Sequence, residues 1–342
     1  MKNYKHAWFI NFTGIGNGVI IAPILKCFEQ SYPTTDYFHS ENEILSDVWF
    51  IKKAGLKRLM GFSPIAWRRF SKKDWENIID FINKNKIDLI VNLRNEGPDY
   101  DTGYYEFKDF LIQDHKIDFW DLDFDIIKKR QTQENLTGDI LDLLQINGVD
   151  ISSYEPRWLS IENTNINKEG FGFGMAASQK NKRWPTHKWV ELAQELLKVH
   201  NQKIILFHGL SQEEIDQALV VQASVGFDKC ELTGHQELKD ITVMLGKLNC
   251  FISNDTGLLH ISSAVGTYTV GLYISTDPNI WSPYCKTNFV YCVNLFMEKC
   301  PARKIYCGNC FHYYDPCPSI TQHGDSIDPK QVLDLVARKV IF

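Results

Sequence analysis

Short apolar runs alternate with segments of helical periodicity along most of the chain. In the N-terminal half, a β-rich run over residues 7–12 ends in a glycine cluster, and an apolar helical stretch over about 19–28 follows it. A second buried strand is predicted over 87–93, after a helical segment around 73–83. This alternation is typical of a parallel sheet covered by helices.

The same alternation restarts after residue 170. Pro185 and Thr186 are predicted to open a helix, because the apolar residues that follow them have helical spacing. The other elements predicted in this half are strands over 171–177, 204–207, 250–253 and 269–273, and helices over 211–221, over 238–248 and from about 256.

The polar, turn-rich segment 155–170 lies between the two halves, as a linker would. We therefore predict an α/β protein of two Rossmann-like domains that face a central cleft, one over 1–155 and the other over 156–342. A length of 342 residues exceeds one ordinary core, which agrees with two domains. For the last helix we also consider packing back onto the N-terminal domain.

Composition narrows the class of protein. The net charge of −5 and the pI near 6.1 argue against a nucleic-acid binder, which needs a basic field. The apolar run over 19–25 is too short to span a bilayer, and polar residues precede it, so we expect neither a membrane span nor a secretory signal. Nine cysteines do not make a secreted disulfide scaffold. We expect a cytoplasmic protein.

Four loops at predicted strand ends carry candidate chemistry. The first contains Gly14, Gly16 and Gly18, where missing side chains let the backbone approach a ligand. Its G-x-G-x-G spacing is not the dinucleotide-binding fingerprint. Two interpretations stay open, ligand contact and a turn that is merely tight. Ligands of open α/β sheets bind at the carboxyl ends of strands, so we expect this loop to face the cleft.

The second loop, over 174–185, places Ser178, Gln179, Lys182 and Arg183 between a strand and a helix. The two cations can neutralise a diphosphate, and the hydroxyl and amide can donate hydrogen bonds to its oxygens. The alternative is a solvated basic loop.

The third loop leads into a helix near Ser211. Either Glu213 or Glu214 can accept hydrogen bonds from ribose hydroxyls. The structural alternative makes Ser211 the helix N-cap and lets both glutamates complement the helix dipole.

The fourth loop is Ser-Asn-Asp-Thr-Gly over 253–257. The backbone N–H groups of Thr256 and Gly257 are predicted to bind an anion at a helix N-terminus. Asp255 repels phosphate, so we expect it to accept hydrogen bonds from sugar hydroxyls. For His260, one turn into the helix, direct ligand contact and simple packing both stay open.

Taken in order and spacing, these loops resemble glycosyltransferase family nine, the bacterial lipopolysaccharide heptosyltransferases. The resemblance covers most of the chain, although residues 30–150 match mainly in pattern. The matching pieces are Ala177-Ser178, Lys182-Arg-Trp-Pro185, Trp189, the segment 209–213, Leu232-Thr-Gly234, Leu238, Asn254-Asp-Thr-Gly257, His260 and Ala264, with a weaker match from Gly14-Ile-Gly16 to Pro23.

The resemblance implies a GT-B fold and inverting transfer of heptose from ADP-heptose to a lipopolysaccharide or surface-glycan acceptor, without a catalytic metal. It implies that Lys182 binds the diphosphate and that Glu213, with Glu214 as the fallback, binds the ribose. Thr256 and Gly257 would hold phosphate, Asp255 would orient the donor sugar, and the Gly14–Gly16 loop would lie on the acceptor side. Lys182 and a helix N-terminus can stabilise the leaving diphosphate in place of a divalent ion.

Asn17 departs from the family pattern. Many members have an aspartate there, proposed as the base, and an amide does not accept a proton usefully at neutral pH. Three explanations of Asn17 stay open: another carboxylate serves as the base, the acceptor chemistry differs, or turnover is impaired. Glu96, Asp99 and Asp101 are candidate bases because they follow a predicted strand, although a charge in such a loop is more often simply solvated.

A basic segment over 48–73 contains no acidic residue, although the whole chain is acidic. We hypothesise that it binds an anionic acceptor or rests on an acidic membrane surface at the cytoplasmic face of the inner membrane. The alternative is ordinary solvated helix faces. Its eight cations include Arg68 and Arg69, and the others are Lys52, Lys53, Lys57, Arg58, Lys72 and Lys73.

Four cysteines cluster near the C-terminus, at Cys300, Cys307, Cys310 and Cys317. Their spacing, with a central C-x-x-C, suits tetrahedral coordination of structural zinc or iron, and His312 is an alternative ligand. Free thiols and, less readily, disulfides are the other interpretations.

Three functions stay open. The first is the heptosyltransferase described above. The second keeps the fold and uses another nucleotide sugar. The third is a sugar-nucleotide-binding protein with impaired catalysis, because of Asn17.

Overall fold

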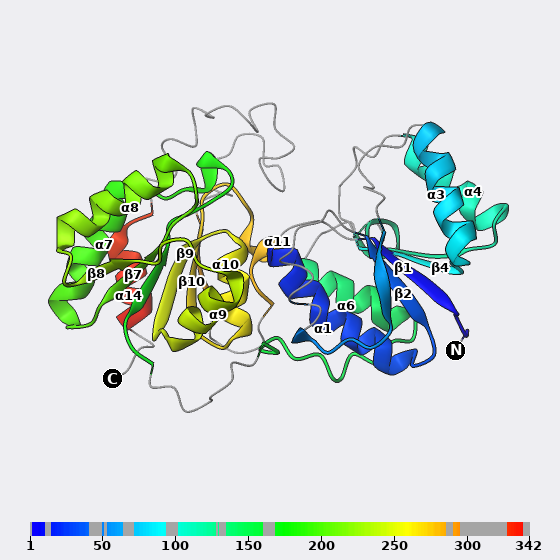
Figure 1. The fold of residues 1–342 in the computed structure, drawn as a ribbon, viewed down its shortest axis with the longest axis horizontal. Helices are drawn as coiled ribbons and strands as arrows, with labels where there is room; N and C mark the ends of the chain where they lie inside the picture. Colours follow the sequence, from blue (N-terminus) through cyan, green and yellow to red (C-terminus); the bar gives the residue numbers. More distant parts are fainter. Residues whose placement is uncertain are drawn as a thin grey trace. The chain divides into compact units, whose positions relative to one another are not determined.

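The computed structural model describes residues 2–10, 15–40, 50, 53–63, 72–93, 102–127, 129, 135–159, 168–284, 290–294 and 327–337. The chain divides into two compact units, Met1–Glu155 and Pro156–Phe342. Each unit is built on its own parallel sheet (Figure 1). Among the described helices, none combines the length and the apolar character that crossing a bilayer requires.

The N-terminal unit contains a five-stranded sheet in the order β3-β2-β1-β4-β5, with all neighbours parallel. Its strands are β1 (His6–Ile10), β2 (Asp36–Ser40), β3 (Leu59–Ser63), β4 (Leu89–Asn92) and β5 (Asp118–Asp121). Its helices are α1 (Ile15–Ser31), α3 (Lys72–Asn85), α4 (Thr102–Gln113) and α6 (Leu136–Ile146), with a π-helix, η1, over Leu122–Ile127.

Neighbouring residues of β1 point to opposite faces of this sheet, and both faces are buried. Trp8 packs in a cluster with apolar residues of α3 and α4. Phe9 packs edge-on against Phe28 of α1, at a ring-centroid distance of 4.8 Å, and against Tyr37 of β2 at 5.5 Å. Burial on both faces explains why β1 is continuously apolar from Ala7 to Ile10 rather than alternating.

The C-terminal unit contains a six-stranded sheet in the order β11-β10-β9-β6-β7-β8, again with all neighbours parallel. Its strands are β6 (Phe171–Gly174), β7 (Ile204–Phe207), β8 (Cys230–Leu232), β9 (Cys250–Asn254), β10 (Tyr268–Tyr273) and β11 (Val290–Asn294). Its helices are α7 (Thr186–Val199), α8 (Gln212–Val225), α9 (Leu238–Lys247), α10 (Gly257–Ala264), α11 (Pro278–Trp281) and α14 (Pro329–Ala337), with a 3-10 turn, η2, over Lys180–Lys182.

The helices of this unit form two layers. On one face of the sheet, α7 packs against α8 and α14, and Trp189 and Val332 share a core with Phe171 and Phe173 of β6 (Figure 1). The helices α9 and α10 contact each other, and on their face a Cβ at Gly172 would meet Leu248 and Phe251. The sheet is therefore covered on both sides.

Most elements predicted for the C-terminal half are confirmed, among them the helix that Thr186 opens and the strand over 204–207. One prediction was wrong. The strand predicted over 171–177 ends at Gly174, and the carbonyl of the next residue, Met175, accepts a hydrogen bond from the Asn254 side chain at 2.7 Å. The apolar face of helix α14, with Val332 and Val336, completes the core of the C-terminal unit.

Candidate functional site

The strand order of the C-terminal sheet reverses between β6 and β9. Helix α7 leads from β6 to β7 on one side, whereas β9 pairs with β6 on the other. Such a switch point opens a crevice at the carboxyl ends of the two strands, and open α/β sheets bind ligands there. The loops that flank this point are residues 175–185 after β6 and residues 255–256 after β9. They contain most of the donor-side residues that the sequence predicts.

Asn254, the last residue of β9, joins these two loops. Its side chain is completely buried; Nδ2 donates to the carbonyl of Met175 at 2.7 Å, and Oδ1 accepts from the backbone N–H of Trp184 at 3.0 Å. One amide thus fixes both ends of the loop after β6. The N–H of Met175 donates to the carbonyl of Phe207 in β7 at 3.0 Å, and the Asn254 side chain supplies the partner of its carbonyl.

A part-buried ion pair crosses the switch point. Lys182 Nζ lies 2.8 Å from Asp255 Oδ2, although the two residues are 73 positions apart. The same oxygen accepts a hydrogen bond from the hydroxyl of Thr276, three residues after β10, at 2.7 Å. Asp255 and Thr276 are both buried, which strengthens these contacts because little water screens them.

The N-terminus of α10 adds positive electrostatic potential at this point. Thr256 is its N-cap in an extended conformation (φ −145°, ψ 171°), and its side chain makes no capping hydrogen bond. The N–H groups of a first helical turn lack intrahelical acceptors. Asp255 directly precedes this cap, so its ion pair holds the Lys182 ammonium beside the helix N-terminus. An ammonium and helix-terminal amides together favour an anion.

His260 lies in the second turn of α10 and is 9% exposed. Burial lowers its pKa to about 4, which the attraction of Asp255 partly opposes and the repulsion of Lys182 reinforces. The imidazole is therefore neutral at physiological pH and adds no charge to the site.

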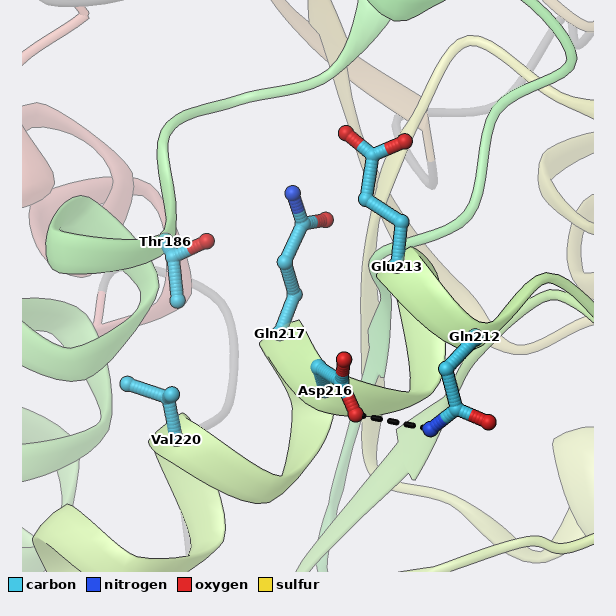
Figure 2. A pocket seen from close by; sticks show the side chains of 6 residues that line it. All are labelled: Thr186, Gln212, Glu213, Asp216, Gln217 and Val220. Carbon is cyan, nitrogen blue, oxygen red and sulfur yellow. Dashed lines mark hydrogen bonds between the residues drawn. The ribbon is translucent and has the colours of Figure 1, made fainter.

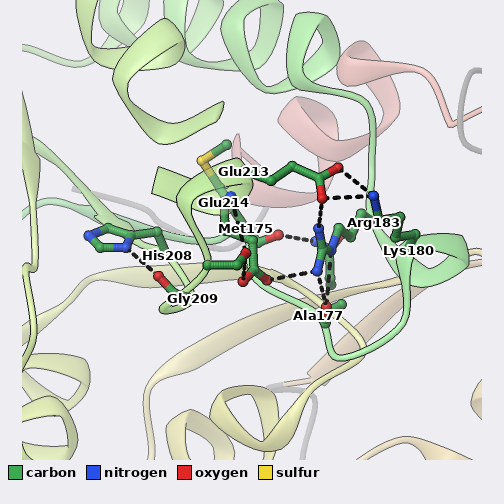
Figure 3. Close-up of polar contacts among 10 residues, drawn as sticks. Met175, Ala177, Lys180, Arg183, His208, Gly209, Glu213 and Glu214 are labelled. Atoms are coloured by element: carbon green, nitrogen blue, oxygen red, sulfur yellow. Dashed lines mark hydrogen bonds and ion pairs between the residues drawn. The ribbon is translucent and has the colours of Figure 1, made fainter. Parts of the chain in front are cut away.

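The Arg183 side chain is only 14% exposed and is held by contacts within the protein. Its Nη2 donates to the carbonyl of Ala177 at 2.8 Å and lies 3.1 Å from Glu214 Oε1 (Figure 3). Glu214 also accepts from the hydroxyl of Ser211 at 2.6 Å, and the Ser211 hydroxyl caps α8 by accepting from Glu214 N–H. The predicted N-cap is confirmed. Binding of a diphosphate by Arg183 stays a prediction.

Glu213 is the more accessible of the two glutamates: its side chain is 46% exposed, against 11% for Glu214. Lys180 Nζ lies 2.8 Å from its Oε2, and this contact lowers the pKa of Glu213. Glu213 also lies on the edge of an open pocket of ≈ 560 Å³ between α7 and α8 (Figure 2). The pocket does not contain Lys182 or Asp255; its lining is Thr186, Gln212, Glu213, Asp216, Gln217 and Val220.

The remaining predicted residues fall into three groups. Ser178 is exposed and Gln179 half-buried, and both lie in the loop after β6. Gly16 and Asn17 are half-buried in the first turn of α1, in the N-terminal unit. The others lie outside the described residues, namely Gly14, Arg68, Arg69, Glu96, Asp99, Asp101, Cys300, Cys307, Cys310, Cys317 and His312. Within the described ranges, no group of three or more His, Cys, Asp or Glu side chains could hold a metal ion.

Asn254 and Thr276 belong to the site, although no role was predicted for either of them. The signal that could have found them is their position, since one ends β9 and the other closely follows the end of β10. β9 flanks the switch point, and β10 is the neighbour of β9 in the sheet.

Comparison with known proteins identifies the family. The family model described as "Glycosyltransferase family 9 (heptosyltransferase)" matches residues 142–309. The lipopolysaccharide core heptosyltransferase OpsX of Haemophilus influenzae is 23% identical over 306 residues, which cover 82% of each chain. The chain belongs to glycosyltransferase family 9. A second family 9 relative, lipooligosaccharide heptosyltransferase 2 of the same organism, is 31% identical over 107 residues, or 30% of each chain.

Solved structures agree on the fold. A family 9 glycosyltransferase from Veillonella parvula superposes with a TM-score of 0.66 at 17% identity, covering 99% of both chains. Escherichia coli heptosyltransferase WaaC, solved with ADP, gives 0.62 at 15% identity, covering 97% of this chain and 99% of WaaC. The iron-containing dodecameric glycosyltransferase TibC of enterotoxigenic E. coli gives 0.57 at 13% identity, covering 99% of this chain and 76% of TibC. The predicted GT-B class, with two Rossmann-like domains, is confirmed.

Proposed function

We propose that this glycosyltransferase transfers a heptose from ADP-heptose, with inversion, to a lipopolysaccharide or other surface-glycan acceptor. The names of its relatives support this substrate class, and WaaC has been solved both with ADP and with ADP-2-deoxy-2-fluoro heptose. The observation that carries the proposal is the Lys182–Asp255 ion pair beside the N-terminus of α10. It assembles an anion site at the switch point of the C-terminal sheet.

The chemistry follows from this charge arrangement. When the bond between the anomeric carbon and the diphosphate breaks, negative charge develops on the leaving ADP. The Lys182 ammonium and the amides of Thr256 and Gly257 stabilise that charge more strongly than they stabilise the intact donor. The ammonium and the helix N-terminus serve where other transferases use a divalent cation, so we propose that catalysis needs no metal.

The remaining donor contacts follow from accessibility. Glu213 is the proposed ribose ligand because its carboxylate is exposed, whereas Glu214 is held by Arg183 and Ser211. To accept hydrogen bonds from ribose hydroxyls, Glu213 gives up its ion pair with Lys180. This pair is exposed, so losing it costs little free energy. Asp255 is proposed to orient the donor sugar. Ser178 and Gln179 supply further donors from the loop after β6, and His260 supplies a neutral ring.

The N-terminal unit is the proposed acceptor domain, and 156–342 the donor domain. On the acceptor side, Gly14 and Gly16 follow β1 in the sequence, with Gly16 in the first turn of α1, and β1 and β4 flank the switch point of that sheet. The base is a carboxylate other than residue 17, with Glu96, Asp99 and Asp101 the candidates. The amide of Asn17, in the first turn of α1, favours a second function, nucleotide-sugar binding with impaired turnover.

Two further proposals concern partners and location. Arg68 and Arg69, with the other cations of the basic segment, are proposed to bind an anionic acceptor or the cytoplasmic face of the inner membrane. The cytoplasmic location rests on the composition discussed above and on this surface. Nucleic acid is not among the proposed partners, because the net charge is −5.

The cysteine cluster at Cys300, Cys307, Cys310 and Cys317 is proposed to hold structural zinc or iron. The spacing supports this, and TibC, which has the same fold, is described as iron-containing. Elemental analysis of protein purified without chelator tests it. One equivalent of zinc or iron per chain is the expected result, and metal-free protein with four titratable thiols would refute it.

Donor turnover tests the function directly. The chain is incubated with ADP-heptose and lipopolysaccharide from a strain that adds no heptose, and ADP release is measured. Release that depends on both substrates is expected. A preference for uridine or guanosine donors would replace ADP-heptose as the substrate. Tight ADP-heptose binding without release, restored by Asn17→Asp, would support the impaired protein instead.

A further inference from the structure

Both side-chain hydrogen bonds to Asp255 within the described residues end on one oxygen. Oδ2 accepts from the Lys182 ammonium at 2.8 Å and from the Thr276 hydroxyl at 2.7 Å. No hydrogen bond from the described part of the chain ends on the second oxygen, Oδ1, which under the proposed function accepts from the donor sugar. A carboxylate that is 8% exposed needs such partners, because a buried charge is costly unless it is paired.

The position of the Thr276 hydroxyl is fixed by the segment that follows it. Thr276 is 5% exposed, and the next residue, Asp277, is the N-cap of α11. Asp277 Oδ1 accepts from the N–H of Asn279 at 2.9 Å, and the Asp277 carbonyl accepts from the N–H of Ile280 at 3.1 Å. Pro278 at the start of α11 restricts the backbone further. The hydroxyl therefore stays in place whatever Lys182 does.

The two donors to Oδ2 differ in this respect. Under the proposed function, Lys182 has a second partner, because the diphosphate attracts its ammonium when the donor binds. A lysine side chain carries a compact charge on a flexible stem, so it can move between the carboxylate and a phosphate oxygen. The threonine hydroxyl sits on a buried, capped turn and has no such alternative.

We infer that Thr276 is a positioning residue for the donor sugar. Its hydroxyl holds the Asp255 carboxylate in orientation when the diphosphate draws the Lys182 ammonium away, so that Oδ1 stays available to the sugar. This inference rests on the proposed function. It assigns Thr276 to recognition of the sugar and not of the nucleotide.

The test compares ADP with ADP-heptose, which carries on its β-phosphate the sugar that ADP lacks. Dissociation constants for both ligands are measured by calorimetry on the wild-type chain and on Thr276→Val, Thr276→Ala and Thr276→Ser. Thr267→Val is the matched control, because Thr267 is a buried threonine whose hydroxyl donates to the carbonyl of Leu245 at 2.7 Å, at the opposite end of β10.

A hydrogen bond to a charged group is typically worth enough for a change on the order of tenfold in affinity. We expect Thr276→Val to weaken ADP-heptose binding about tenfold while ADP binding changes by less than about twofold. Thr276→Ser should restore wild-type binding, and Thr267→Val should leave both constants unchanged. If the valine variant does not fold, Thr276→Ala gives the same comparison without a branched side chain.

Two results would overturn the inference while leaving nucleotide binding intact. One is equal weakening of ADP and ADP-heptose, which makes Thr276 a general structural residue. The other is unchanged binding of both ligands in Thr276→Val, or a serine variant as defective as the valine one. Failure of the wild-type chain to bind ADP at all would instead refute the proposed function.

Discussion

Asn254 gives the sharpest prediction about how the fold builds the site. The Asn254→Ala substitution removes both hydrogen bonds of a fully buried amide, one to the N–H of Trp184 and one to the carbonyl of Met175. Trp184 and Met175 are themselves buried, so water does not replace the lost partner. The loop after β6 then loses the contact that fixes both its ends.

The size of the effect follows from the two groups left unpaired. Each buried backbone group without a partner costs about 1–3 kcal/mol, so we expect the free energy of unfolding of the C-terminal unit to fall by about 2–6 kcal/mol. For a unit of this size, at about 2–4 °C per kcal/mol, the Tm should drop by about 4–24 °C. Asn254→Asp should be comparably harmful, because it turns an oxygen instead of an N–H group toward the Met175 carbonyl.

The assay is urea and thermal unfolding followed by circular dichroism, with ADP binding measured on the folded variants. Asn249→Ala is the control. Its side chain donates to Gln202 Oε1 at 2.9 Å in a part-buried position where water can replace the bond, so its cost should stay below about 1 kcal/mol. If Asn254→Ala costs no more than Asn249→Ala, the amide does not hold the loop and the reasoning fails.

Three other changes have defined outcomes. Gly174→Ala places a Cβ 2.7 Å from the Phe251 ring and also against Ser253, so overpacking should cost about 1–3 kcal/mol; an unchanged Tm would contradict this. Burial lowers the pKa of His260 to about 4, so between pH 4 and 6.5 the unfolded chain binds more protons than the folded chain. The free energy of unfolding therefore decreases as the pH is lowered through that range. Lowering the pH from 7 to 5 should cost about 2 kcal/mol through His260, and His260→Gln should flatten the profile, whereas an identical slope would refute the assignment. Replacing Arg68 and Arg69 by Glu should weaken binding to anionic vesicles or to the acceptor about tenfold or more, without changing ADP affinity. If vesicle and acceptor binding are both unaltered, the basic segment has neither of the proposed roles.

Local chemistry made much of the C-terminal unit predictable. The helix spacing after Pro185, the Ser211 cap and the apolar strands around 204–207 and 250–254 depend on residues near one another in the chain. The glycine and Asn-Asp-Thr-Gly loops could be placed at strand ends for the same reason. The switch-point rule then brought Lys182 and Asp255 to the same edge of the sheet.

Pairing across long sequence distances was not predictable in the same way. The sequence suggested that Lys182 and Arg183 act together on a diphosphate, whereas the structure pairs Lys182 with Asp255 and gives Arg183 to Ala177 and Glu214. Two adjacent cations look alike in the sequence, and only the directions of their side chains in the structure show that they have different partners. Short, partly polar strands such as β2 likewise depend on tertiary packing.

ADP binding by Lys182→Met tests most directly whether the β6–β9 switch point holds a diphosphate site. Lys188→Met is the control, since Lys188 lies on α7 with only a weak contact to Glu191 at 3.8 Å. Thermal unfolding of both variants checks that they are folded. The structure predicts that Lys182→Met loses at least about tenfold in ADP affinity and that Lys188→Met binds ADP as the wild type does. Undiminished ADP binding by folded Lys182→Met would contradict the account.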